Sequence, residues 1–392
     1  MQENSNSWPK MRVGDLLERV VRPLQVEGGN TYQEIGIRSH CKGIFHKTPV
    51  TGQQIGEKRV FWIEPGCLIF NIIFAWEHAI ALTTENERGL IASHRFPMYR
   101  STNGILLPEF AYLYFSSPRG KYDLALASPG GAGRNKTLGQ EEFKRLRIPV
   151  PPLREQHEIV EILKTWDREI SQTEKLIAAK RRLKQGLMQQ LLTGKRRFPE
   201  FTGKWPRYSF GEIASLGKKR HDPKKNGNRR RCVELEHIAQ VDGRLLDTVH
   251  SDAQQSSKSV FSAGDVLFGK LRPNLRKFIH CSFDGVCSTE IWVLKVNPEI
   301  CCSDYLFCLV QTDRFIAAAC TTTGSKMPRA DWDWVSEQMF RLPPKPEQEK
   351  ISRSLGMMDR EIERLSQLAD QLKYQKRGLV QKLLTGKVRV RV

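Results

Sequence analysis

Two long stretches of the chain place apolar residues at alternating intervals of four and three positions. The first series runs from Ile159 to Leu191 and the second from Ile351 to Leu383, with a few Lys and Thr residues among its positions. This spacing is the pattern of a helix that buries one stripe of side chains against another helix. No proline interrupts either series. The pattern therefore predicts two helices of about 40 residues, each on the order of 60 Å long.

The two stretches are copies of each other. Residues 155–197 align without a gap on residues 347–389, and roughly 19 of about 43 positions are identical. Both copies open with Glu-Gln and close with Leu-Leu-Thr-Gly-Lys. Prolines before each copy forbid helix there, and we expect the helices to stop at Gly194 and Gly386 in a left-handed cap. Because the two seams share a phase, we expect the helices to pair within the chain, and a coil between two chains is the alternative.

The segments that precede the two helices share a plan. Each begins with Trp-Pro, carries a turn glycine followed by an apolar run of strand length, and ends with a helical stretch and a basic glycine-bearing loop. Elsewhere the two segments diverge. We predict a mixed α+β protein with two α/β globules and a pseudo-twofold, antiparallel intramolecular coiled coil. The predicted segments are globule 1 (1–147), helical repeat 1 (148–204), globule 2 (205–340) and helical repeat 2 (341–392).

Charge gives the first functional clue. The chain has 63 Lys and Arg against 43 Asp and Glu, for a net charge of +20. This excess favours a polyanionic partner such as nucleic acid, with a solvated basic surface or an acidic lipid as the alternatives. Hydrophobic residues make up 39% of the chain, enough for real cores, which argues against a disordered basic tail. Residues 1–10 are polar and no stretch has the length of a membrane span, so a cytoplasmic location is expected.

The sequence gives little support for a metal site or for disulfide bonds. The nine cysteines include no Cys-x-x-Cys pair, and the Cys301-Cys302 doublet lies in an apolar run. We expect reduced, mostly buried thiols. Residues 234–237, Glu-Leu-Glu-His, alternate as a strand does and have no second metal ligand nearby, so no metal site is expected.

One pattern of motifs carries a resemblance to a known family. Residues 148–156 read Ile-Pro-Val-Pro-Pro-Leu-Arg-Glu-Gln, a long helix follows, and Leu-Leu-Thr-Gly-Lys closes it; the arrangement occurs twice around divergent globules. The second opening, Leu-Pro-Pro-Lys-Pro-Glu-Gln at 342–348, departs from the fuller pattern. The whole chain resembles the specificity subunit of type I restriction-modification enzymes. This resemblance implies that each globule is a target recognition domain for one half of a split DNA sequence, and that the helices are a fixed spacer.

The resemblance also implies partners. These are double-stranded DNA, two methyltransferase subunits docked largely on the helical repeats, and two motor-nuclease restriction subunits. S-adenosylmethionine, ATP and Mg²⁺ would belong to those other subunits, with no cofactor on this chain. Two alternatives stay open: the same role in a fused methyltransferase-nuclease (type IIB-like) system, and a basic coiled-coil scaffold that binds RNA or protein.

Catalytic motifs are missing from the sequence. An adenine methyltransferase should show Asn or Asp before Pro-Pro, but Val150 and Leu342 stand there. A Walker loop needs a glycine five residues before Gly-Lys, where the chain has Gln189 and Gln381. The triplet Glu-Phe-Lys at 142–144 matches half of a nuclease centre without its Pro-Asp partner. We expect a non-catalytic chain.

DNA reading requires cations for the phosphates together with Arg, Lys, Asn, Gln or Ser on rigid supports that reach base edges. In globule 2 the segment after the 266–268 strand and the basic loop near its end form the best candidate surface. Globule 1 offers the corresponding loop and three weaker candidates. The candidates are Arg134, Asn135, Lys136, Arg59, His94 and Arg95 in globule 1, and Lys270, Arg272, Asn274, Arg276, Lys277, Ser325, Lys326 and Arg329 in globule 2.

Two further basic runs flank a loop rich in Pro, Gly and Asn, and we expect them to follow phosphates without selecting sequence. They are Lys218, Lys219 and Arg220, and Arg229, Arg230 and Arg231. On the first helix, a basic stretch fits either an exposed face or a methyltransferase docking site. It comprises Lys180, Arg181, Arg182 and Lys184.

Overall fold

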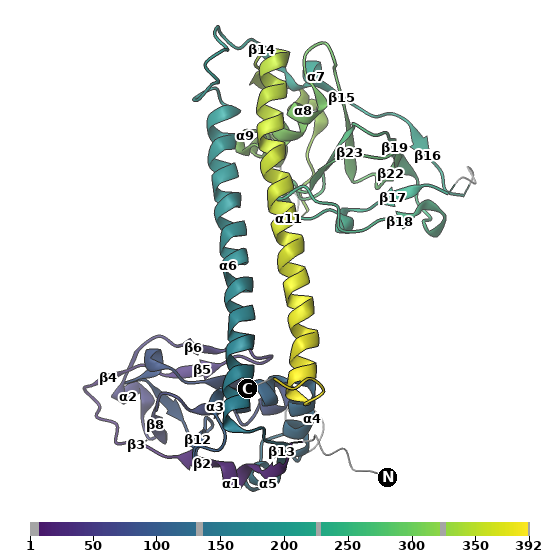
Figure 1. Cartoon of the computed structure of the whole chain (residues 1–392). Coiled ribbons are helices and arrows are strands. Elements are labelled where there is room, and N and C mark those ends of the chain that lie inside the picture. Colours follow the sequence, from purple (N-terminus) through teal and green to yellow (C-terminus); the bar gives the residue numbers. More distant parts are fainter. Residues whose placement is uncertain (1–7, 131–135, 225–228, 322–326, 391–392) are drawn as a thin grey trace, which may run out of the picture. The chain divides into compact units, whose positions relative to one another are not determined.

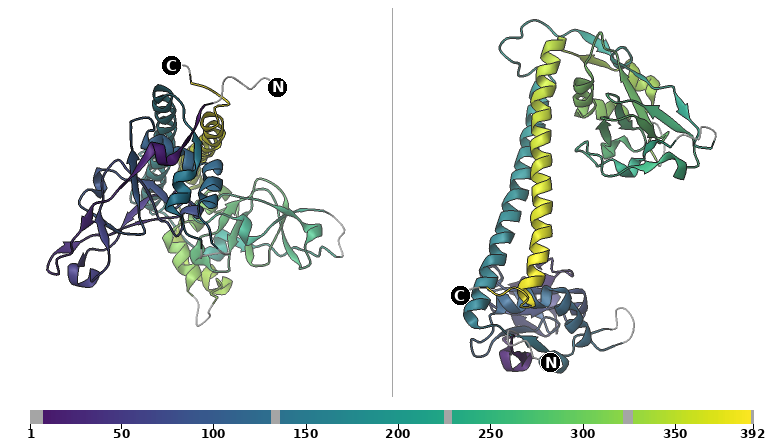
Figure 2. Two further views of the ribbon diagram at one scale, coloured as in Figure 1. Left: turned by 90° about the horizontal axis from the view of Figure 1, so that it is seen from below. Right: turned by 45° about the vertical axis from the view of Figure 1, so that its right-hand side comes forward.

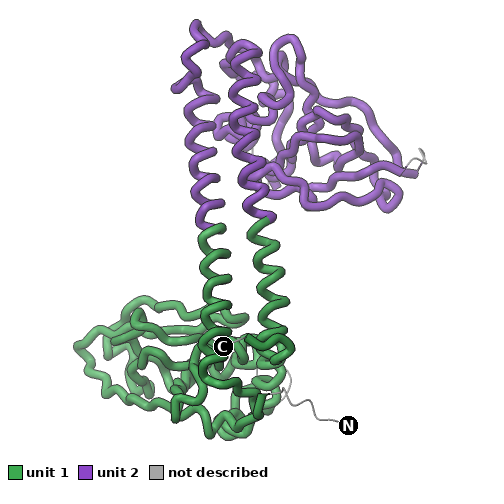
Figure 3. The backbone as a smooth tube through the Cα atoms, viewed as in Figure 1, with its two compact units in different colours: residues 1–173, 368–392 green, residues 174–367 purple. Residues whose placement is uncertain are grey.

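The computed structural model describes residues 8–130, 136–224, 229–321 and 327–390. The chain forms two compact units, unit 1 (residues 1–173 and 368–392) and unit 2 (residues 174–367), shown in Figure 3. Each unit joins one globule to a segment of each long helix. The boundaries expected for the four sequence segments stay predictions.

The two long helices are α6 (Leu153–Leu191) and α11 (Lys345–Leu384). Within each unit a segment of α6 lies side by side with a segment of α11, as the views in Figures 1 and 2 agree. In unit 1 ion pairs join Glu155 to Arg389 and Asp167 to Lys376, so the two segments run antiparallel. In unit 2 ion pairs join Lys180 to Glu361 and Lys184 to Asp359, which gives the same direction. Every position of the predicted seam is buried or half-buried. The coiled coil expected from the 4-3 spacing is confirmed.

Both helices begin directly after a proline pair, as predicted. Their ends differ slightly from the expectation, because regular helix stops at Leu191 and Leu384, before the glycines. Gly194 and Gly386 have φ values of 73° and 68° and turn the chain away from the helix just beyond its end.

A four-stranded antiparallel sheet forms the centre of each globule, with the same strand order in both. The order is β10-β9-β12-β2 in unit 1 and β21-β20-β23-β15 in unit 2. The predicted strands after Gly66 and Gly264 are β9 and β20. In unit 1 the strands are β2 (Leu17–Val20), β9 (Leu68–Phe70), β10 (Ile80–Leu82) and β12 (Met98–Ser101). In unit 2 they are β15 (Ala214–Leu216), β20 (Val266–Gly269), β21 (Phe278–His280) and β23 (Ile291–Val296).

A short two-stranded sheet ties the start of each globule to the strand that leads into its long helix. The pairs are β1 (Lys10–Arg12) with β13 (Arg147–Pro149), and β14 (Arg207–Ser209) with β24 (Met339–Arg341). A single helical turn follows the first strand of each pair, α1 (Val13–Leu16) or α7 (Phe210–Ile213). In both units these elements directly follow the Trp-Pro pair that opens the globule in the sequence.

The remaining sheets differ between the units. Unit 1 has a three-stranded sheet of β11 (Ile91–Ser93), β8 (Val60–Trp62) and β3 (Pro23–Leu24), and the pairs β4 (Thr31–Tyr32) with β7 (Val50–Thr51) and β5 (Ile35–Ile37) with β6 (Ile44–His46). Unit 2 has a five-stranded sheet of β16 (Arg220–His221), β19 (Lys258–Phe261), β22 (Gly285–Cys287), β17 (Arg231–Val233) and β18 (Val249–His250). Among the described residues, the duplicated sheets are therefore the central sheet and the short two-stranded sheet.

Helices complete both globules. The predicted helical stretches are α3 (Pro108–Ser116) and α8 (Ser303–Val310), followed by α4 (Pro118–Leu126) and α9 (Asp313–Cys320). Shorter helices are α2 (Gly52–Ile55), α5 (Gln140–Arg145) and α10 (Trp332–Glu337). The main core of unit 1 includes Ile159 and Leu383, and that of unit 2 includes Leu191 and Ile351. The long helices are thus part of each globule's own core.

The structure corrects one local prediction. Residues Leu235–His237 form a 3₁₀ turn, η4, instead of a strand. The ring Nδ1 of His237 accepts the backbone N–H of Glu234 at 3.0 Å, and this local bond competes with strand pairing. Among the described residues no group of His, Cys, Asp and Glu is arranged to hold a metal ion.

All nine cysteines are free thiols, and six of them are buried. Burial raises the pKa of Cys281 and of Cys232 to about 12, which makes these thiols unreactive. In the part of the chain that the structure describes, no helix combines the length and the apolar character needed to cross a membrane.

Candidate functional site

In unit 1 the buried carboxylate of Glu155, at the start of α6, accepts hydrogen bonds from residues that are remote in the sequence. Arg389 donates from Nε to Glu155 Oε1 at 2.7 Å and from Nη2 to Oε2 at 2.8 Å, and Trp8 donates its indole N–H to Oε2 at 3.1 Å. The Arg389 guanidinium also lies 5.3 Å from the centre of the Trp8 ring. Burial alone would raise the pKa of Glu155, but the hydrogen bonds from Arg389 and Trp8 lower it below its usual value.

The same three residue types form the corresponding hydrogen-bonded group in unit 2. Arg197 donates from Nε and Nη2 to the two oxygens of Glu347 at 2.9 and 2.7 Å, and Trp205 donates to Oε2 at 3.2 Å. In each unit the Glu comes from the start of one repeat and the Arg from the end of the other. We call each Glu-Arg-Trp group a clasp. Paired guanidinium-carboxylate bonds are strong and directional, so each clasp fixes the helix pair against the first strand of its globule.

The Gln that follows each clasp Glu is fully buried and anchors the globule. Gln156 donates to the backbone oxygens of Ile105 and Pro151, and accepts the N–H of Leu107 at 2.8 Å. Gln348 does the same with the oxygens of Ile300 and Pro343 and the N–H of Cys302 at 3.0 Å. Leu107 and Cys302 are the N-caps of α3 and α8. The Gln of the repeated Glu-Gln thus holds the start of α3 in unit 1 and of α8 in unit 2.

A Lys-Asp pair inside the coiled coil is also duplicated. Lys184 Nζ lies 2.6 Å from Asp359 Oδ1 in unit 2, and Lys376 Nζ lies 2.5 Å from Asp167 Oδ1 in unit 1. Lys184 is buried and also donates to Gln311 Oε1 at 3.2 Å. Burial raises the pKa of Asp359, against the opposing effect of Lys184.

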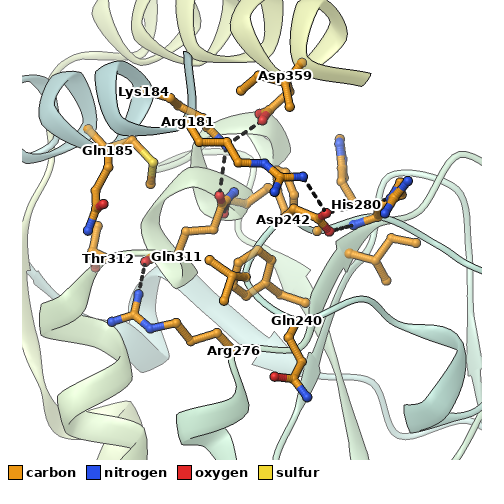
Figure 4. Close-up of a pocket in the computed structure, with 18 of the residues that line it drawn as sticks. Arg181, Lys184, Gln185, Gln240, Asp242, Arg276, His280, Gln311, Thr312 and Asp359 are labelled. Carbon is orange, nitrogen blue, oxygen red and sulfur yellow. Dashed lines mark hydrogen bonds and ion pairs between the residues drawn. The ribbon is translucent and has the colours of Figure 1, made fainter. Parts of the chain in front are cut away.

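A pocket of about 920 Å³ lies within unit 2 between the helix segments and the globule. Figure 4 shows Lys184 directed between Asp359 and Gln311, and Arg181 directed toward Asp242, 3.6 Å away. Arg276 donates to the backbone oxygen of Gln311 at 3.2 Å. Lys184 and Arg181 therefore connect the helix segment to Gln311 and Asp242 of the globule. The basic stretch 180–184 of the first helix makes this connection at two of its positions, Arg181 and Lys184.

The best candidate surface of globule 2 is assembled as one platform. The backbone N–H of Arg272 donates to Pro328 O at 2.8 Å, and Lys270 O accepts the N–H of Ala330 at 2.8 Å. The segment after β20 is thereby joined to the end of the basic loop. The side chain of Arg329 pairs with Glu290 at 2.8 Å, and Lys277 Nζ donates to the backbone oxygen of Leu235 at 2.5 Å.

The weaker candidates of globule 1 lie near one another. The N–H of His94 donates to Arg59 O at 3.2 Å, and Arg95 O accepts the N–H of Ile72 at 3.0 Å. The ammonium of Lys136 lies 5.6 Å from the centre of the Trp76 ring. The three residues Arg59, His94 and Arg95 are exposed. Arg59, His94 and Arg95 are therefore neighbours. Arg134 and Asn135 of globule 1 lie outside the described residues, as do Ser325 and Lys326 of globule 2.

The two basic runs lead into strands β16 and β17 of the five-stranded sheet of unit 2. Lys218 and Lys219 are exposed, and among the described residues their side chains make no hydrogen bond or ion pair. Arg220 donates to Ser259, Arg229 pairs with Asp252 at 3.5 Å, and the Arg231 guanidinium lies 3.8 Å from the centre of the Phe283 ring. Arg230 is exposed.

Comparison with known proteins explains the duplication. The family model described as "Type I restriction modification DNA specificity domain" matches residues 70–180 and 203–374. The chain belongs to this specificity family. The specificity subunit of the type I restriction enzyme EcoDI from Escherichia coli is 26% identical over 203 residues, which cover 50% of this chain and 43% of that protein. In this alignment the specificity chain therefore spans less than half the length of its relative.

Solved structures show the same fold. The HsdS subunit from Thermoanaerobacter tengcongensis has a TM-score of 0.52 at 18% identity, with 98% of each chain covered. The type I S subunit from M. genitalium has a TM-score of 0.58 at 13% identity, and the comparison covers 100% of this specificity chain and 99% of that one. The resemblance stated from the sequence motifs is confirmed.

Sequence reasoning left the clasp residues and the two buried glutamines without a role. Their signal was present in the sequence, because Glu155, Gln156 and Arg197 recur at the same offset as Glu347, Gln348 and Arg389. Identity at polar positions of the two repeats pointed to a shared contact. The specificity chain uses that contact to join each globule to the coiled coil.

Proposed function

We propose that this chain is the DNA-recognition subunit of a type I restriction-modification complex, without catalytic activity of its own. Each globule would read one half of a bipartite double-stranded target. The observation that carries this proposal is the duplicated central sheet and clasp, combined with different side chains at the same loop of each globule: Arg272 and Asn274 in unit 2, Phe74 and Trp76 in unit 1. A common scaffold with unlike loops suits a protein that reads two different half-sites.

The helices would set the distance between the half-sites and carry the methyltransferase subunits. Leu176 and Leu368 occupy equivalent positions of the two repeats, and each side chain is 44% exposed. Leu183, one heptad after Leu176, is 54% exposed. Exposed leucines on a helix surface are typical of a face that receives another helix. We propose that two methyltransferase subunits dock there, one for each repeat, and that two restriction subunits join them. S-adenosylmethionine, ATP and Mg²⁺ would bind those partners.

The test is footprinting and methylation mapping of the complex formed with its methyltransferase. We expect protection of two short elements at a fixed spacing, with one modified adenine in each. Exchanging residues 1–147 for those of another family member should change one half-site only, and a change in both would contradict the modular assignment. Insertion of residues into α6 near Leu191 should alter the spacing and leave both half-sites unchanged. Binding without a spaced target, or equal binding to RNA, would overturn the proposal.

A further inference from the structure

One loop of unit 2 combines unusual backbone geometry with free polar side chains. It connects β20 to β21 and contains a one-turn 3₁₀ helix, η6 (Pro273–Leu275). The residues on either side of η6, Arg272 and Arg276, have φ values of 52° and 51°. Left-handed backbone is uncommon at residues other than Gly, Asn and Asp, and it persists only where the surroundings enforce it. Two such arginines within five residues therefore mark a loop whose shape is imposed.

The surroundings hold this loop from several sides. Gly269 N–H donates to Lys277 O at 2.8 Å at the base of the hairpin, and Lys270 N–H donates to Glu290 O at 3.0 Å. Arg276 O accepts the N–H of Val241 at 2.9 Å, and its side chain bonds to Asp313. Together with the bonds from Arg272 to Pro328 and from Ala330 to Lys270, these contacts make the loop a rigid support.

The fixed loop leaves two side chains exposed for contact. Arg272 and Asn274 are both exposed, and among the described residues neither side chain makes a hydrogen bond or an ion pair. Their neighbours Arg276, Lys277 and Arg329 are occupied within the protein. Among its described residues, the candidate surface of unit 2 thus contains residues that brace the loop and two, Arg272 and Asn274, whose exposed side chains are free for contact.

We infer that Arg272 and Asn274 read the major-groove edges of purines in the half-site recognised by unit 2. This inference rests on the proposed function. Arg bonds in pairs to the N7 and O6 of guanine, and Asn to the N7 and N6 of adenine, geometries that need a fixed backbone. A phosphate contact needs only a charge, so it does not account for an imposed loop or for an uncharged Asn.

The corresponding loop of unit 1 supports this division of roles. Ile72 takes the place of Lys270, with its O accepting Leu138 N–H at 2.8 Å, and His78, with a φ of 61°, takes the place of Arg276. The hydrogen bond at Ile72 and the left-handed residue at His78 are therefore shared with unit 2, whereas Phe74, at the position of Arg272, has a φ of −122°. At the positions of Arg272 and Asn274, unit 1 has Phe74 and Trp76. Phe74 packs against a core cluster of unit 1, and the Trp76 indole N–H donates to Ile73 O at 3.0 Å. The exposed polar pair is thus found at these positions in unit 2 and not in unit 1, as expected if the two units read different half-sites.

The experiment uses the full complex with its methyltransferase and a randomised DNA library, with methylated adenines read by sequencing. The variants are Arg272→Gly and Asn274→Ala, with Lys219→Ala as the matched control for charge. Glycine adopts the left-handed backbone freely, so Arg272→Gly should fold at least as well as the wild type. A thermal melt of each variant checks this.

We expect Arg272→Gly and Asn274→Ala each to reduce discrimination at one position of one half-site by about tenfold or more, with the other half-site unchanged. Lys219→Ala should weaken binding evenly on all sequences. If Arg272→Gly also acts evenly, or if both variants keep full discrimination, the inference is wrong. If the wild type itself selects no bipartite sequence, the proposed function fails instead.

Discussion

Arg389 and Glu155 lie 234 positions apart in the sequence, yet the guanidinium of one holds both oxygens of the other at 2.7 and 2.8 Å. Glu155 is 3% exposed. Arg197 and Glu347 repeat the contact in unit 2. Each clasp therefore connects the end of one helical repeat to the start of the other. The packing of each globule on the helices thus includes a contact between residues that are far apart in the chain.

Removing the clasp arginine should destabilise unit 1. Arg389→Ala leaves the buried carboxylate of Glu155 with fewer donors, and we expect a loss of about 2–3 kcal/mol in the free energy of unfolding. Urea denaturation measures it. Lys387→Ala, an exposed lysine of the same segment, is the control and should change stability by less than about 0.5 kcal/mol. Equal effects of the two substitutions would contradict the role of the clasp.

The clasp also predicts a dependence on pH. The pKa of Glu155 is lowered in the folded protein, because the bonds from Arg389 and Trp8 outweigh burial. Its stabilising contribution is therefore complete above the ordinary value of 4.5 and is lost as the pH falls through the lowered value. Stability measured from pH 7 down to pH 3 should fall more steeply in the wild type than in Glu155→Gln. Parallel curves would show that Glu155 does not titrate in this way.

The duplicated Lys-Asp pairs allow a comparison of burial with the chemistry held constant. The side chains of Lys184 and Asp359 are 11% and 36% exposed, against 21% and 62% for Lys376 and Asp167. Double-mutant cycles with Lys→Met and Asp→Asn should give a coupling of about 1–3 kcal/mol in unit 2 and less than about 1 kcal/mol in unit 1. The reverse order would show that burial does not set the strength of these pairs.

The buried glutamines should tolerate little change. Gln156→Leu removes three hydrogen bonds and leaves the N–H of Leu107 and the oxygen of Ile105 without their partner. We expect a loss of about 2–4 kcal/mol, and the same for Gln348→Leu in unit 2. The control is Gln189→Leu, at an exposed helical position, and the measurement is chemical denaturation. A loss below about 1 kcal/mol would show that water replaces the amide.

Glycines of the two repeats should respond with opposite signs. Gly194 and Gly386 have positive φ, so alanine there should cost about 1 kcal/mol. Gly186 and Gly378 lie inside the helices, where an added Cβ meets nothing within 4 Å, and alanine should stabilise by about 0.5–1 kcal/mol. Thermal melting of the four variants tests both signs. Stabilisation by Gly194→Ala would contradict the left-handed cap.

The basic runs of the five-stranded sheet should act on all DNA alike. Neutralising Lys218, Lys219 and Arg230, which are exposed, should lower affinity for specific and nonspecific DNA together. It should also reduce the slope of log affinity against log salt by about one for each phosphate that the protein no longer neutralises. Binding titrations at several salt concentrations measure this. Weaker binding at one half-site only would assign these residues to base reading.

Much of the architecture followed from the sequence. The 4-3 spacing located both long helices and their seam, because a continuous apolar stripe indicates a helix whichever surface packs against that stripe. Glycines ahead of apolar runs located β9 and β20, and the repeat showed that the plan is duplicated. The 3₁₀ turn at Leu235–His237 was missed, since a local hydrogen bond from Glu234 to His237 outweighs the alternation of its side chains.

The roles of individual side chains were decided by the tertiary structure. Arg272, Arg276 and Lys277 are equally basic in the sequence, but only Arg272 projects freely, because Arg276 and Lys277 reach acceptors brought near by folding. The hydrogen bonds between Glu155 and Arg389 likewise form only because the C-terminal segment packs against unit 1. Sequence patterns record burial and local conformation, which depend on neighbours along the chain. Pairing of polar groups depends on distances that only the packed fold sets.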